Sequence, residues 1–180
     1  HSQTPQNLFQ SICTQTNLKS FYMKWAAIDD LSPIVGLQSI THLHITGSVK
    51  VKSIDALAKL QTLIDLSLEN FLGISNYQAI GELTKLTRLG IHGDGIASMK
   101  KIKIDSLEFI SSLHQLERLS IMWAIVQDKS FSSLTALKQL QHLDLPNLKD
   151  QELQQQLLAT LPLIKTGNFL DLSSTKRAFR

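Results

Sequence analysis

Leu63-Ile64-Asp65-Leu66-Ser67-Leu68 carries apolar side chains at its first, fourth and sixth places, and this spacing recurs along most of the chain. The fourth and sixth places alternate with polar residues, as in a short strand that buries one face. Starting points of successive units lie 22, 23, 23, 30, 24 and 24 residues apart. This regular recurrence predicts a repeat protein with units beginning at Leu18, Ile40, Leu63, Leu86, Leu116, Leu140 and, more weakly, Ile164.

The segments between these units carry apolar residues of their own, at spacings of three and four. Leu57 and Leu60 are one example, and Leu134 and Leu137 are another. Such spacings indicate single helical or 3₁₀ turns. We therefore predict parallel strands stacked on one face and short turns returning along the other.

A period in the twenties with this apolar pattern resembles leucine-rich repeats, over about residues 18–170. The resemblance implies an α/β solenoid, with a curved parallel sheet on the concave face and short helical or 3₁₀ turns on the convex face. Residues 28–40, with Pro33 in the turn, are similar to the returning segment of internalin-type repeats, and this local resemblance, confined to about residues 28–68, suggests a bacterial source. Such repeats carry an asparagine three places after the last apolar residue of the strand. Because other residues stand at this place here, we expect less regular turns. These residues are Ser48, Phe71, Asp94, Ala124 and Leu148.

The two ends of the chain depart from the repeat. Residues 1–17 are predicted to form an N-terminal capping helix, with Thr4 as its N-cap and Pro5 at its first helical position. Such a helix would cover the first layer of the core with an apolar face of Leu8, Phe9, Ile12 and Cys13. Cys13 is expected to be buried, with a reactive thiol as the alternative. Residues 171–180 are predicted to be a basic tail.

Composition limits the classes of function. The formal charge is +3, and the single cysteine allows no disulfide within the chain. The longest apolar run, Ile121 to Val126, is far shorter than the roughly 20 residues of a membrane-spanning helix. We expect a soluble monomer without membrane insertion, with a cytoplasmic location favoured over secretion.

The interval of 30 residues between Leu86 and Leu116 contains about seven additional residues, which the comparison of units places around Ile96 to Ile102. Lys100 and Lys101 belong to this insertion. Insertions in repeat proteins map to surface loops, and they are either tolerated bulges or functional segments.

The residues between the apolar places should face outward and form columns across the concave sheet. Positive and negative residues are balanced there, five of each, whereas a nucleic-acid backbone requires a stripe of one sign. We therefore expect no nucleic-acid partner. The surplus lysines should lie in loops and on the convex side, where they serve solubility. Trp123 with Met122 should form an exposed apolar spot, unless Trp123 packs over the edge of the repeat. The residues predicted to bind a protein partner are His44, Asp65, Glu69, Arg88, His92, Arg118, Met122, Trp123, His142 and Asp144.

The chain lacks the Gly-x-x-x-x-Gly-Lys and Gly-x-Ser-x-Gly motifs. We therefore expect a non-enzymatic protein-interaction scaffold without a cofactor or metal. One alternative is the recognition domain of a larger secreted bacterial effector or enzyme. A minor alternative is a metal-dependent hydrolase that uses His42, His44 and Asp65, because two imidazoles and a carboxylate can hold a metal ion.

Overall fold

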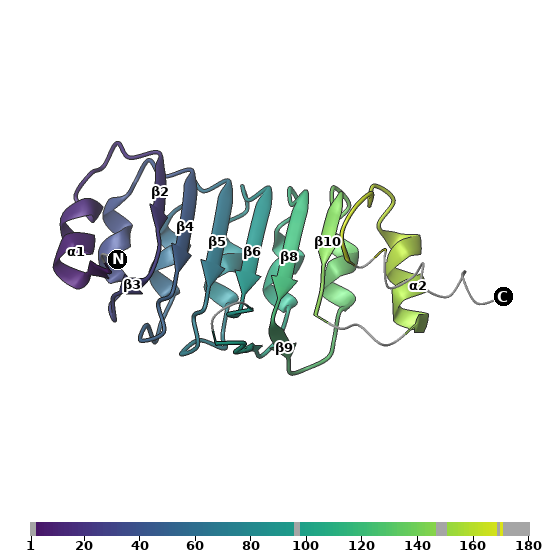
Figure 1. The fold of residues 1–180 in the computed structure, drawn as a ribbon. Coiled ribbons are helices and arrows are strands. Elements are labelled where there is room, and N and C mark those ends of the chain that lie inside the picture. Colours follow the sequence, from purple (N-terminus) through teal and green to yellow (C-terminus); the bar gives the residue numbers. More distant parts are fainter. Residues whose placement is uncertain (1–2, 96–97, 147–150, 169, 171–180) are drawn as a thin grey trace.

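The computed structural model describes residues 3–95, 98–146, 151–168 and 170. Within these residues, one sheet runs the length of the molecule and contains six parallel strands in chain order (Figure 1). The leucine-rich repeat solenoid predicted from the spacing is confirmed. The strands are β2 (Ser20–Met23), β4 (His42–Thr46), β5 (Asp65–Glu69), β6 (Arg88–His92), β8 (Arg118–Met122) and β10 (His142–Asp144).

Each strand begins at the third place of its unit, so equivalent places lie side by side across the sheet. Leu66 pairs with Leu43 on one side and with Leu89 on the other. All three leucines are buried, because the fourth place faces the turns behind the sheet. The repeat spacing therefore determines the strand register directly.

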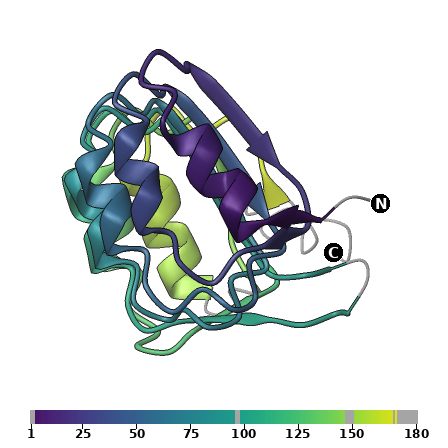
Figure 2. The same ribbon diagram turned by 90° about the vertical axis from the view of Figure 1, so that its left-hand side faces the viewer.

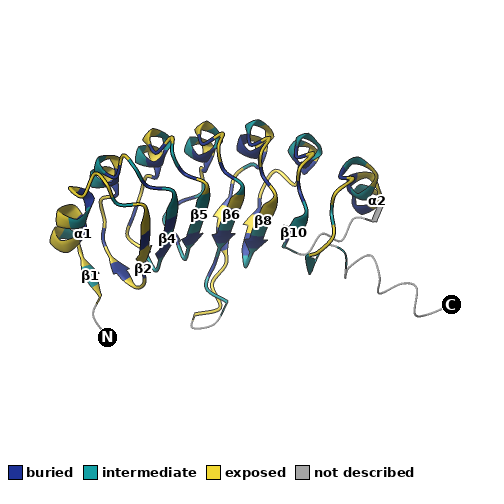
Figure 3. Cartoon of the chain, turned by 90° about the horizontal axis from the view of Figure 1, so that it is seen from above, coloured by how far each residue is buried: buried dark blue, intermediate teal, exposed yellow. Residues whose placement is uncertain are grey.

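The returning segments form 3₁₀ helices on the opposite face, as the spacing of three and four predicted. They are η1 (Ser32–Gly36), η2 (Asp55–Lys59), η3 (Gln78–Glu82), η4 (Glu108–Ser112) and η5 (Ser132–Ala136). The last return instead contains an α-helix, α2 (Gln151–Thr160). Figure 3 shows the turns along the outer side of an arc and the strands along its inner side, with the buried residues between them.

The N-terminal cap is a helix, α1 (Gln6–Cys13), which packs over the first turn (Figure 2). Thr4 is not its N-cap, and that prediction was wrong. Pro5 holds the N-cap position, because Thr4 and Pro5 form strand β1 (Thr4–Pro5), which pairs with β3 (Ala26–Ala27). Leu8 is 48% exposed and does not share the buried face.

Cys13 lies in the buried face of α1. Burial raises the pKa of its thiol to about 11, so the reactive thiolate is scarce near neutral pH. Gly36 allows the close approach of α1 to η1, since a Cβ at that position would overlap the carbonyl oxygen of Cys13. The buried role predicted for Cys13 fits this environment.

A strand that the sequence did not reveal follows the insertion and begins at its last predicted residue, Ile102. β7 (Ile102–Ile104) pairs with β9 (Ala124–Val126) in a separate two-stranded parallel sheet. Before it, Asp94 and Lys100 form an antiparallel bridge, while Ile96 of the predicted insertion lies outside the described residues. Because Ile102 pairs with Ala124, strand β7 resumes the repeat, and the additional residues precede it. Residues 98–101 are the part of the insertion before β7 that the structure describes.

At the C-terminal end, the seventh unit continues the pairing through a single bridge between Thr166 and His142. Phe169 of that unit and the predicted tail, residues 171–180, lie outside the described residues. None of the helices in the described part of the chain is both long and apolar enough to cross a membrane.

Candidate functional site

The outward-facing side chains of the main sheet form three rows across the concave face. The third-place row contains His42, Asp65, Arg88, Arg118 and His142 in register. The fifth-place row contains Tyr22, His44, Ser67, Gly90, Ser120 and Asp144. The seventh-place row contains Thr46, Glu69, His92 and Met122. Nine of the ten predicted partner-binding residues therefore lie in these rows.

One cluster surrounds Asp65, whose side chain is 14% exposed. Its Oδ2 accepts a hydrogen bond from Nε of Arg88 at 2.8 Å, and Oδ1 lies 3.0 Å from Nε2 of His44. Asp65 and Arg88 are opposite each other in register on neighbouring strands, which allows this ion pair. The histidine that contacts Asp65 is His44, although His42 is the one opposite Asp65 in register.

The metal-dependent alternative is disfavoured by this arrangement. The guanidinium of Arg88 contacts Asp65 and also lies 3.4 Å from Nε2 of His42. A cation already occupies the space where these two side chains would have to share a metal ion. In the described part of the chain, no group of three histidine, cysteine, aspartate or glutamate residues could hold a metal.

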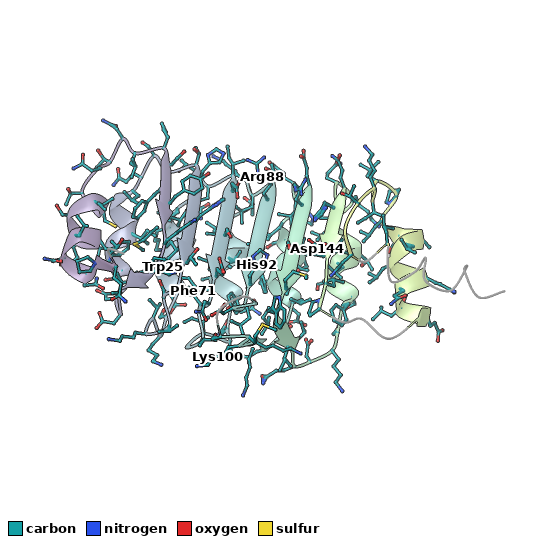
Figure 4. All side chains as sticks on the ribbon, viewed as in Figure 1. Trp25, Phe71, Arg88, His92, Lys100 and Asp144 are labelled. Atoms are coloured by element: carbon teal, nitrogen blue, oxygen red, sulfur yellow. The ribbon has the colours of Figure 1, made fainter. Side chains whose placement is uncertain are left out.

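A second cluster surrounds Asp144 at the other end of the sheet (Figure 4). Its Oδ2 lies 2.9 Å from Nε2 of His142 and accepts a hydrogen bond from Oγ of Ser120 at 3.0 Å. Oδ1 accepts the backbone N–H of Asn168 at 2.8 Å. The Asn168 side chain in turn bonds both the backbone N–H and the carbonyl of Leu145. Asp144 and Asn168 thus join the last strand to the seventh unit.

Two titratable groups of this cluster have shifted pKa values. Burial alone would raise the pKa of Asp144, but the hydrogen bonds from Asn168, His142 and Ser120 more than offset it, so the pKa is lowered. Burial lowers the pKa of His92 despite the nearby carboxylates Glu69 and Asp144 and its contact with Ser120. At neutral pH, Asp144 is therefore ionised and His92 is neutral.

Arg118 stands apart from both clusters. Its neighbours in register are Arg88 and His142, so it lies in a run of basic side chains. It is exposed, and no carboxylate of the described residues lies within 4.0 Å of it. Arg88, by contrast, is paired with Asp65. Arg118 consequently presents a charge without a carboxylate partner among the described residues, on the next-to-last strand of the concave face.

The imidazole of His92 packs against Gly90. A Cβ on Gly90 would lie 3.2 Å from Cε1 of His92 and 3.3 Å from Oγ of Ser67. Nε2 of His92 lies 3.1 Å from Oγ of Ser120. The absence of a side chain at Gly90 thus lets the imidazole lie along the sheet, where it links the seventh-place row to the Asp144 cluster.

Trp123 is the predicted residue that the structure places outside the three rows. It follows β8 with a φ of 53°. A Cβ on Gly95 would overlap its indole ring, so Trp123 packs over the inserted loop. The expectation of an exposed apolar spot was wrong for Trp123, and the alternative of packing at the repeat edge describes it.

The same eighth place takes a left-handed backbone in other units as well. The φ angles are 86° at Gly47 and 62° at Asn70, residue types that tolerate this region, but 51° at Trp25. A bulky residue there costs on the order of 1–2 kcal/mol. Both tryptophans are therefore held in a strained turn by their surroundings.

Three residues of the concave-face clusters were not predicted from the sequence, namely Ser120, Asn168 and Tyr22. Ser120 and Asn168 complete the Asp144 cluster, and the register of the fifth place could have indicated Ser120, which lies beside Asp144. Tyr22 is 62% exposed, and its ring contacts that of His44 with a centroid separation of 4.5 Å. Its place in the fifth-place column was visible, but the ring contact required the side-chain geometry.

No protein-family model matches the chain, and no curated protein matches its sequence. Solved structures do share the fold. Internalin C2 from Listeria monocytogenes superposes with a TM-score of 0.61 at 22% identity, over 83% of this chain and 60% of that one. Internalin F of the same organism superposes with a TM-score of 0.59 at 19% identity, over 88% of this chain and 50% of that one.

A structure named PEPR1-AtPEP1 gives a TM-score of 0.50 at 14% identity, over 77% of this chain and 19% of that one. The chain thus spans less than two thirds of each of these structures, and the likeness concerns the fold. Together with the parallel sheet and its 3₁₀ turns, it establishes the architecture. The chain folds as a leucine-rich repeat solenoid that resembles those of internalins.

Proposed function

We propose that this chain is a non-enzymatic scaffold that binds a protein partner through the concave face of its main sheet. The observation that carries the proposal is Arg118, an exposed cation between Arg88 and His142 without a carboxylate partner in the described structure. A carboxylate of the partner would supply the missing counter-charge. Arginine suits this role because its planar fork holds a carboxylate through two hydrogen bonds.

The surroundings of Arg118 support a preorganised surface. Asp65 fixes Arg88 on one side, and Asp144 with Ser120 fixes His142 and His92 on the other. Side chains that are already ordered lose little entropy on binding. Glu69, His92 and Met122 would contact the partner from the seventh-place row, while Trp123 would act indirectly by holding the inserted loop.

The recognition-domain alternative places the same surface within a longer protein. It is favoured by one observation, namely that the chain spans only 60% and 50% of the two internalins. Binding through Arg118 is expected in either case, so both forms of the proposal share one test.

The test uses a photocrosslinking amino acid in place of Ser67, which lies on the concave face, or of Lys59, which is exposed on η2. In an extract of the source cells, the Ser67 position should give a discrete protein adduct that excess unlabelled protein suppresses. Adding Arg118→Glu should weaken this adduct by about tenfold or more, as expected for an interfacial arginine. Adding Lys85→Glu, on an exposed turn, should not.

Equal adducts from Lys59 and Ser67, or an adduct unaffected by Arg118→Glu, would contradict binding through this face. Circular dichroism of each variant separates loss of binding from loss of the fold.

A further inference from the structure

A group of lysines lies along one edge of the solenoid, where the strands of the main sheet end. The segments that follow β4, β5, β6 and β8 are residues 47–54, 70–77, 93–107 and 123–131. They contain six of the fourteen lysines and no histidine or arginine. All six are exposed, and together we call them the lysine ridge: Lys50, Lys52, Lys100, Lys101, Lys103 and Lys129. Figure 4 shows Lys100 at this edge, below the sheet.

Exposed aliphatic side chains lie between these lysines. Met99 is 58% exposed, Ile125 is 49% exposed and Val49 is 43% exposed. Ile125 is opposite Lys103 in the β7–β9 pair, and their neighbours on each strand are buried, so both point outward. Their backbones lie about 4.8 Å apart, as in any sheet. The ridge therefore alternates positive charge with apolar surface at close range.

The carboxylates on these segments offset only half of the charge. They are Asp94, Asp105 and Asp128, three against six lysines. Each accepts a hydrogen bond from a serine: Asp94 from Ser98, Asp105 from Ser75 and Asp128 from the backbone N–H of Ser130. The ridge thus carries a positive excess of three charges.

The ridge is built into the fold. The backbone N–H of Asp94 bonds the carbonyl of Lys100 at 2.9 Å, and that of Ile102 bonds the carbonyl of Trp123 at 3.0 Å. A Cβ on Gly93 would overlap both of these carbonyls, so glycine permits the close packing. Lys52 lies across the next unit, with Nζ 3.1 Å from where a Cβ on Gly73 would be. The lysines therefore belong to adjacent, mutually packed segments.

We propose that the lysine ridge binds the surface of an anionic lipid bilayer. Lysine carries a compact charge on a flexible stem without a fixed bidentate geometry, whereas the planar arginine fork that selects individual carboxylates or phosphates is absent from these segments. A cluster of four to eight basic residues is the size that anionic headgroups attract. Met99, Val49 and Ile125 supply the apolar contacts with the acyl boundary. No aromatic side chain among the described residues of these four segments is exposed, and Trp25, 54% exposed beside Gly47, is a single ring, whereas single-stranded nucleic acid stacks on successive rings.

The experiment is co-sedimentation of the whole chain with vesicles of phosphatidylcholine alone or mixed with phosphatidylserine. Binding should occur to the mixed vesicles and fall as salt is raised, because exposed charges are screened. The variant Lys50→Glu, Lys100→Glu, Lys101→Glu should bind at least about 100-fold more weakly, since each lysine near the surface contributes about fivefold. Met99→Ser should weaken binding without changing its salt dependence.

The matched control has the same charge change elsewhere on the exposed surface: Lys19→Glu, Lys59→Glu, Lys85→Glu. It should retain most of the binding. Three outcomes would overturn the proposal: no binding to mixed vesicles, equal binding to neutral vesicles, or equal losses in the two triple variants. Binding to soluble poly-glutamate that is tighter than binding to vesicles would overturn it too and assign the ridge to an acidic polypeptide.

Discussion

Asp144→Asn should destabilise the C-terminal end of the solenoid and remove a pH dependence of its stability. The amide oxygen of the new side chain can still accept the N–H of Asn168. Its NH₂ group, however, replaces the oxygen that now faces Ser120 and His142. Hydrogen bonds to a charged group contribute about 1.5–3 kcal/mol each. The Asp144 side chain is 21% exposed, and solvent weakens these bonds. We therefore expect the free energy of unfolding to fall by about 2 kcal/mol when the bonds to Ser120 and His142 are both lost.

The pH dependence follows from the lowered pKa of Asp144. The unfolded chain, with an ordinary carboxyl pKa of 3.8, binds more protons in the acid range than the folded chain does. The stabilisation is therefore fully present above that value and is lost as the pH falls through the folded pKa. Below both values, wild type and Asp144→Asn should approach each other in stability.

Thermal unfolding by circular dichroism, measured between neutral pH and about pH 2, tests this directly. At neutral pH the melting temperature should fall by roughly 4–8 °C, given 2–4 °C per kcal/mol for a chain of this size. Asp55→Asn, at an exposed position of η2, is the matched control and should change little. If the difference in melting temperature between wild type and Asp144→Asn stays constant down to about pH 2, the hydrogen bonds to the ionised Asp144 do not cause the loss of stability.

Three further predictions concern packing. Leu66→Ala should lower the free energy of unfolding, measured in urea, by about 2–5 kcal/mol, because Leu66 is fully buried between two neighbouring layers. Ile64→Ala should lower it much less, because Ile64 is 37% exposed. Equal losses would contradict the assigned faces. Alkylation of Cys13, followed by mass spectrometry, should be slow in the folded protein and fast in urea, and equal rates would contradict its burial. Gly95→Ala should displace the indole of Trp123 and shift its fluorescence to the red, while an unchanged spectrum would show that Trp123 does not pack there.

Most of the fold could be predicted from the sequence because the repeat is nearly one-dimensional. Each layer contacts only its neighbours, so the spacing of Leu43, Leu66 and Leu89 sets both the strand and its register. The same register brings Asp65 and Arg88 side by side, where they form an ion pair. The N-cap at Pro5 and the β7–β9 pair did not follow from the repeat spacing, because both depend on contacts between segments outside the repeat pattern.

The candidate site was predicted in outline and corrected in detail. The register placed nine of the ten predicted residues on the concave face, but it could not distinguish His44 from His42 as the contact of Asp65. That choice depends on side-chain rotamers. Trp123 was misplaced because its left-handed φ turns the side chain toward Gly95.

By itself, the sequence determined the period, the buried leucines and the columns of polar residues, since these follow from local alternation and a constant repeat length. Only the tertiary structure decided which polar residues pair with each other and which remain uncompensated. Arg88 and Arg118 occupy the same place in adjacent units, yet among the residues that the structure describes only Arg88 has a carboxylate within 4.0 Å. The lysine ridge likewise arises from segments far apart in the chain that stacking brings to one edge. Hydrogen bonds and charge balance depend on distances across layers, and the folded solenoid sets those distances.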